Sequence, residues 1–174
     1  PAALGHLFFL LQGKGTLKFH DGHIDEIVSP ALFGPCMGAA EFTFEGPLHD
    51  FGFALTPLGF AALTGKAANL YADRAVPASE LFGPEIEDLA ETFRQGHAGG
   101  TLRIAQMAEM ATAFLMKRVK PVPAAHALLI QTVVNWLSSD LDPNVDVLYA
   151  QLDMSRSTAA RLITRYFGCA PKPL

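Results

Sequence analysis

The pattern of apolar residues along the chain changes near residue 65. Before this point, short segments rich in phenylalanine and leucine (7–11, 16–20, 41–44 and 50–55) are separated by glycine and proline. Turn residues at this density favour a β-sandwich or barrel over alternating βαβ units, so we expect Gly13 and Gly46-Pro47 to lie between strands. Beyond residue 65 the apolar residues recur at helical spacing. The sequence therefore predicts an α+β protein with its strands first.

Composition excludes several classes of protein. Of the 174 residues, 50% are hydrophobic and 17% charged, which excludes intrinsic disorder. No apolar run approaches the roughly 20 residues of a membrane helix, and no secretory signal is visible. Cys36 and Cys169 are far apart and lack ligand-like spacing, so we expect reduced thiols in a cytoplasmic protein. The chain starts at Pro1, and we expect the natural N-terminus to lie upstream.

Four helices are predicted between the β-rich part and the last thirty residues. They are 57–63, which Thr56 can cap, 84–95, which Gly96 closes, 101–118, which Thr101 can cap, and 124–138. The helix at 124–138 is so apolar that we expect it to be covered on most sides. Helix 101–118 has an apolar stripe that includes Met107 and Phe114, and this stripe can pack either in the internal core or against a second copy of the chain as a dimer seam. A basic, proline-broken connector at 117–123 suggests a division into 1–65, 66–122 and 123–174.

The last thirty residues predict a helix-turn-helix. A short helix at 145–152 precedes a turn at Asp153-Met154, and Ser155 can cap a second helix from 156 to 167, which Gly168 ends. At 100° per residue, Ala159, Leu162, Ile163 and Tyr166 share one face, and arginines and hydroxyls share the opposite one. Such a face suits the major groove of double-stranded DNA. The candidate DNA-binding residues are Ser155, Arg156, Ser157, Thr158, Ala160, Arg161, Thr164 and Arg165.

Charge is distributed unevenly along the chain. Residues 1–116 carry six Lys/Arg and thirteen Asp/Glu, whereas residues 117–174 carry seven basic and four acidic residues. A basic end on an acidic body favours a polyanionic partner. A merely solvated basic face on a terminal helix explains the same spacing, and the pattern alone does not separate the two interpretations.

These residues resemble a known family. The segment 147–155, continuing through Arg161 to Gly168 and Pro171-Lys172, is similar to a helix-turn-helix of AraC-family transcription regulators. The segments 10–13, 32–35 and 55–59 resemble the cupin-like sensor of one branch of that family. The resemblance implies a jelly-roll-like ligand sensor, connecting helices and a DNA-binding region that acts as a homodimer. Such regulators carry two helix-turn-helix units, so we expect a second unit outside this chain.

The chain departs from the family pattern at several positions. Ser157 stands where this branch commonly has arginine, which affects base preference. Ala159 and Ile163 replace larger core residues, and we expect Tyr149, in place of a small residue, to fill part of that volume.

For the β-rich part we expect an apolar pocket that takes a small organic effector. The candidate lining residues are Phe8, Phe42, Phe44, Phe51 and Phe53, each of which also fits plain core.

A metal-dependent cupin enzyme is the main alternative. His20 and His23 have the wrong spacing for its ligands, and we expect no helix or strand register to aim Asp25 and Glu26 together with His23 at a metal ion. We therefore expect no metal, no cofactor and no enzymatic activity. A ligand-binding or oligomerisation module without DNA binding also stays open.

Overall fold

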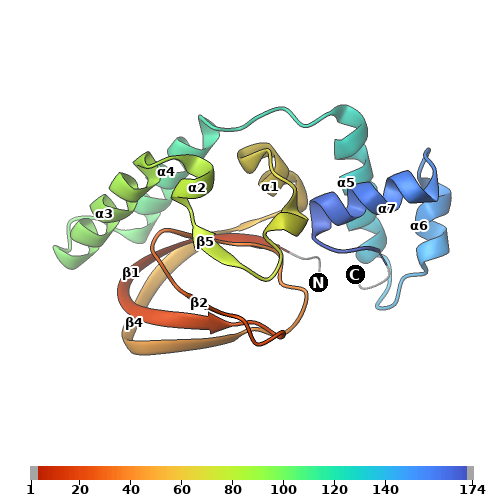
Figure 1. Ribbon diagram of the computed structural model, residues 1–174. Coiled ribbons are helices and arrows are strands. Elements are labelled where there is room, and N and C mark those ends of the chain that lie inside the picture. The colour runs from red at the N-terminus through yellow and green to blue at the C-terminus, as the bar shows by residue number, and fades with distance from the viewer. Residues whose placement is uncertain (1–3, 172–174) are drawn as a thin grey trace.

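The computed structural model describes residues 4–171 and has α+β architecture, in which a curled antiparallel sheet has four strands before the first helix and a fifth strand after it (Figure 1). The strands are β1 (Gly5–Lys18), β2 (Ile24–Glu26), β3 (Ala31–Phe33), β4 (Glu41–Leu55) and β5 (Ala75–Pro77). The helices are α1 (Pro57–Thr64), a 3-10 turn η1 (Ala68–Leu70), α2 (Ser79–Phe82), α3 (Glu85–Ala98), α4 (Ile104–Met116), α5 (Ala124–Leu137), α6 (Val145–Gln151) and α7 (Arg156–Phe167). Within the described residues, every helix is too short or too polar to cross a membrane.

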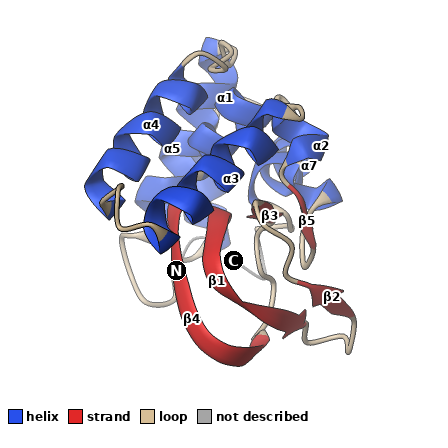
Figure 2. Ribbon diagram, turned by 90° about the vertical axis from the view of Figure 1, so that its left-hand side faces the viewer, coloured by secondary structure: helices blue, strands red, loops and turns tan. Residues whose placement is uncertain are grey.

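β1 is the central strand of the sheet. On one side it pairs with β3 near its start and with β2 near its end, and on the other side it pairs with β4 along nearly its whole length. β5 extends the sheet beyond β3. Figure 2 shows the long β1–β4 pair curling away from the helices that lie above it.

The prediction that Gly13 and Gly46-Pro47 separate strands is wrong, because both lie inside continuous strands. The β1–β4 register shifts between Leu10 and Gln12 and again between Gln12 and Lys14, so these residues form β-bulges. Gly13 has φ 101°, and a Cβ there would lie 2.8 Å from the Pro47 carbonyl oxygen. Glycine therefore bends the paired strands without reversing them.

The bulges also change which residues of β1 face which layer. Before Gly13, Phe9 points into the core beneath the helices, and Phe8 and Leu10 contact the opposite cluster. After the bulges it is Leu17 that joins the cluster of Leu10. A shift of one residue reverses the alternation of a strand, which explains why one fixed period does not describe β1.

Two clusters of buried side chains cover the two faces of the sheet. Helices α2, α3 and α4 pack on the first face, where Phe9 meets Phe93 of α3 with ring centroids 5.2 Å apart. On the other face Phe33 contacts Phe8, with centroids 5.4 Å apart, in a cluster with Leu10 and Leu17.

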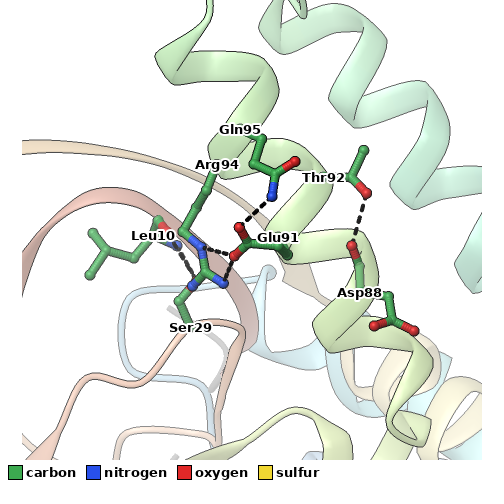
Figure 3. A network of polar contacts seen from close by, with 7 residues as sticks. All are labelled: Leu10, Ser29, Asp88, Glu91, Thr92, Arg94 and Gln95. Carbon is green, nitrogen blue, oxygen red and sulfur yellow. Dashed lines mark hydrogen bonds and ion pairs between the residues drawn. The ribbon is translucent and has the colours of Figure 1, made fainter.

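Polar contacts hold the connection before β3 against β1 and stabilise the outer face of α3 (Figure 3). The Ser29 hydroxyl accepts a hydrogen bond from the Leu10 amide and donates one to the Leu10 carbonyl, both at 3.0 Å. On α3, the Glu91 carboxylate accepts hydrogen bonds from Arg94 and Gln95. These two hydrogen bonds lower the pKa of Glu91.

Two helix boundaries differ from prediction. α3 continues through Gly96 to Ala98, because Gly96 is a packing residue: a Cβ there would lie 2.4 Å from Leu102 Cδ1. α4 begins after Arg103 rather than Thr101, and the Arg103 amide is held by the side chain of Gln106 at 2.9 Å. α1, α5, α6 and α7 lie within a residue or two of their predicted bounds, whereas the short α2 and η1 were not predicted.

The apolar stripe of α4 faces inward. Met107 and Ala111 are fully buried against α3 and the sheet, and Phe114 packs partly buried beside them under the guanidinium of Arg118. The stripe therefore belongs to the internal core. The exposed side of α4 carries Met110 and Met116.

A third cluster joins α5, α6 and α7, the terminal helical group, to α1. Leu129 and Val133 of α5 pack with Ile163 and Phe167 of α7, and Ala61 of α1 completes the cluster. α5 is covered except along one exposed stripe, to which Leu128, at 69% exposure, belongs.

Candidate nucleic-acid interface

The predicted second helix of the helix-turn-helix is α7, with the predicted ends. The Ser155 hydroxyl accepts a hydrogen bond from the Thr158 amide at 3.2 Å, which satisfies one of the free donors of the first turn. Gly168 ends the helix in the left-handed conformation, where its amide donates to the Thr164 carbonyl.

The inner face of α7 is the predicted one. Ala159, Leu162, Ile163 and Tyr166 are buried, and Phe167 is fully buried beside them. The Tyr166 hydroxyl lies 2.7 Å from Nδ1 of His126 on α5, so a side-chain hydrogen bond adds to the apolar packing of this face. Because these contacts fix the rotation of α7 about its axis, they also fix which residues face outward.

The outward residues include most of the predicted DNA-binding set. Ser155, Arg156, Ser157, Arg161 and Arg165 are exposed, and Thr158, Ala160 and Thr164 are half-buried. Thr164 also donates its hydroxyl to the Ala160 carbonyl at 2.9 Å.

Arg156 is already engaged within the terminal helical group. Its Nη2 lies 2.8 Å from Oδ1 of Asp146, and its Cζ lies 5.1 Å from the centre of the Tyr149 ring. Tyr149 therefore lies beside Arg156 and does not fill the volume near Ile163, contrary to expectation. Leu148 occupies the inward position of α6 in the cluster with Ile163, and the next residue, Tyr149, points away from that cluster.

The second half of the outward face lies against the segment between α1 and η1. Arg161, Thr164 and Arg165 share the lining of a cavity of about 340 Å³ with Ala67 and Asn69. We call this contact the α7 seam. It continues past the helix end, where a Cβ on Gly168 would lie 3.3 Å from Pro35 Cβ.

The five candidate pocket phenylalanines divide between the two faces of the sheet. Phe51 stacks on Phe9 and, with Phe53, packs against the core beneath α3. Phe8 and Phe42 both contact Phe33 on the other face, and Phe44 stacks on Phe42 with centroids 5.8 Å apart. The structure therefore does not bring the five together around one cavity.

Two histidines of the β-rich part, His23 and His49, have side-chain partners. His23 Nε2 lies 2.7 Å from Asp25 Oδ1. A tight turn explains this contact, because the His23 amide also donates to Asp21. His49 Nδ1 lies 2.8 Å from His97 Nε2 across β4 and α3. Among residues 4–171, no three His, Cys, Asp or Glu side chains are placed to share a metal ion.

The two thiols lie near one carboxylate. Burial and the negative charge of Asp73 raise the pKa of both Cys36 and Cys169 above their ordinary values. Asp73 is held in place because its Oδ1 accepts a hydrogen bond from the Met37 amide at 2.8 Å. Both cysteines are free thiols.

Sequence reasoning missed the residues that face α7 from outside the terminal helical group. Asn69 and Lys66 lie about a hundred positions before α7, and no spacing rule relates them to it. Lys172, part of the predicted basic end, lies outside the described residues.

Comparison with known proteins found no relative of this chain. No protein-family model, no curated protein and no solved structure matches the chain.

Proposed function

We propose that this protein is a cytoplasmic, ligand-responsive transcription regulator that binds double-stranded DNA through α7, in the manner of AraC-family proteins. The observation that supports the proposal is the division of α7 into two faces. One face is buried against α5, and the other presents Arg161, Arg165 and several hydroxyls. A helix fixed in this way by its neighbours suits insertion into the major groove.

In this proposal the outward residues have different roles. Arg161 donates two hydrogen bonds to a guanine edge, which contributes base preference. Ser155 and the free amides at the start of α7 hold a phosphate. Arg165 lies further along the helix and contacts the phosphate backbone, which adds affinity without base preference.

The curled sheet is proposed to be a cupin-like sensor, a jelly-roll-like sheet whose inner face is lined by Phe8, Phe33 and Phe42. A small organic effector on this part regulates DNA binding by population shift, because the ligand binds two arrangements of the sensor and the terminal helical group unequally. In the arrangement described above, the α7 seam lies beside Arg161 and Arg165 and restricts one side of the DNA-binding face.

Selection of duplexes from a random pool tests this proposal. The protein is expected to enrich a defined sequence, and Arg161→Ala is expected to weaken binding to that sequence by about 1–3 kcal/mol while relaxing preference at one base pair. Lys18→Ala, which removes an exposed cation of β1, serves as the matched control and is expected to change neither quantity. Enrichment that Arg161→Ala leaves unchanged would exclude α7 as the DNA-reading helix.

A further inference from the structure

The α7 seam gathers positive charge from three separate parts of the chain. Arg161 and Arg165 come from α7, and Lys66 follows α1. Lys120, in the connector before α5, lies close by, because a Cβ on Gly65, which lines the same cavity as Lys66, would lie 3.8 Å from Lys120 Nζ. Among residues 4–171, no ion pair within 4 Å involves any of these four cations.

Two neighbouring cavities open between these cations. The cavity of about 340 Å³ is lined by Arg161, Arg165 and Asn69, which can donate to an anion, and by Thr164, whose hydroxyl already donates to the Ala160 carbonyl. A second cavity of about 190 Å³ lies beside the first, because Arg165 lines both, and it adds Lys66 and Tyr166. No lining residue of either cavity is acidic.

We infer that the α7 seam is a binding site for a small molecule that carries two or more negative charges, such as a polycarboxylate or a phosphorylated metabolite. Guanidinium groups bind carboxylate and phosphate oxygens with paired hydrogen bonds, and Lys66 supplies a point charge from the neighbouring cavity. The first cavity alone is in the size range of small-ligand sites. The cavity has room for one such anion, and a DNA phosphate that reaches Arg161 and Arg165 from outside is the alternative that the test below separates.

Such a ligand would connect the two sides of the seam. It would contact Asn69 of η1 together with Arg161 and Arg165 of α7, with Lys66 in the adjoining cavity, and so it would stabilise this arrangement of α7 and η1. If α7 binds DNA as proposed, the ligand and the DNA compete for the same two arginines. The anion is then a negative effector, an inference that rests on the proposed function, whereas the anion site itself does not.

Calorimetric titration at constant ionic strength tests the site, with inorganic pyrophosphate and citrate as probes and methyl glucoside as a neutral comparison. At least one of the two anions is expected to bind saturably, and which one binds distinguishes phosphate from carboxylate chemistry. Lys66→Gln and Arg165→Gln are each expected to weaken binding about tenfold, the size of one lost charge-assisted hydrogen bond. Lys18→Gln, remote from the seam, is expected to leave the affinity unchanged.

Two results would overturn the anion site. One is the absence of saturable binding by either anion, and the other is an equal loss of affinity in Lys18→Gln and in the seam variants, which would show general charge screening. The melting temperature of each variant identifies any loss of folding, and the exposure of Lys66 and Arg165 predicts none.

Duplex binding measured in parallel separates the two proposals. Anion binding without DNA binding supports the site and contradicts the DNA-binding function, and the reverse result does the opposite.

Discussion

The amide of Lys120, in the connector between α4 and α5, donates a hydrogen bond to the carbonyl of Ala62 in α1, with 2.7 Å between nitrogen and oxygen. Two neighbouring residues of α1 belong to different hydrophobic clusters. Phe60 packs in the cluster beneath α2, α3 and α4, and Ala61 packs in the cluster of α5, α6 and α7. α1 and the connector therefore fix the terminal helical group beside the sheet.

This attachment predicts slow hydrogen exchange at the Lys120 amide. Ala61→Asp is expected to place a charge in the cluster shared with α5 and α7, to loosen the attachment and to accelerate that exchange. Leu58→Asp, on an exposed part of the same helix, is the control and is expected to leave it slow. Equal exchange rates in the wild type and Ala61→Asp, measured by NMR, would show that α1 does not hold the connector.

The cap of α7 predicts a modest loss of stability on Ser155→Ala. The substitution leaves the Thr158 amide without its acceptor, and we expect the free energy of unfolding to fall by about 1 kcal/mol. Urea denaturation measures the change. Ser157→Ala, one residue into the exposed face, should alter stability much less, and an equal loss in both variants would contradict the role of the cap.

The position of Met107 predicts that a charge there is not tolerated. Met107 is fully buried against α3, so Met107→Glu is expected to lower the free energy of unfolding by about 3 kcal/mol or more. Met110→Glu, on the exposed side of the same helix, is expected to keep the fold. A folded Met107→Glu monomer obtained from a wild-type dimer, seen by light scattering, would instead support the dimer-seam interpretation.

The position of Asp73 near both thiols predicts that one substitution changes the reactivity of Cys36 and Cys169 together. Its negative charge disfavours both thiolates, so near neutral pH Cys36 and Cys169 should react with iodoacetamide more slowly than an unperturbed cysteine. Asp73→Asn keeps an oxygen that can accept from Met37 and suits the positive φ of 52° at this position. It is expected to lower both pKa values and accelerate both reactions, whereas an unchanged rate at both thiols would exclude the influence of this carboxylate.

The sequence predicted the helical half of the fold better than the sheet. Capping residues such as Thr56 and Ser155 act on their own first turns, so the starts of α1 and α7 are readable from local residues. Gly13 and Gly96 were misinterpreted as breaks, because their roles depend on distant partners. Gly13 approaches Pro47 across the sheet, and Gly96 makes room for Leu102.

The candidate site shows the same limit. The two faces of α7 follow from helical periodicity, and the buried positions of Ala159 and Ile163 agree with it. That Arg161 lies opposite Asn69 depends on how α1 and the connector place the terminal helical group, and no local pattern encodes this placement. The phenylalanines of β4 are different, because their division follows from ordinary alternation: Phe42 and Phe44 differ in parity from Phe51 and Phe53 and therefore face the opposite way.

The proposal that α7 binds DNA is tested most directly by the salt dependence of duplex binding. Fluorescence anisotropy with a labelled duplex gives the binding constant of the chain at several salt concentrations. The wild type is expected to show a linear fall of log K with log salt, and Arg165→Ala is expected to reduce the slope by about one, because one fewer phosphate is neutralised. Absence of salt-dependent duplex binding, or a slope that Arg161→Ala and Arg165→Ala both leave unchanged, would contradict the proposal.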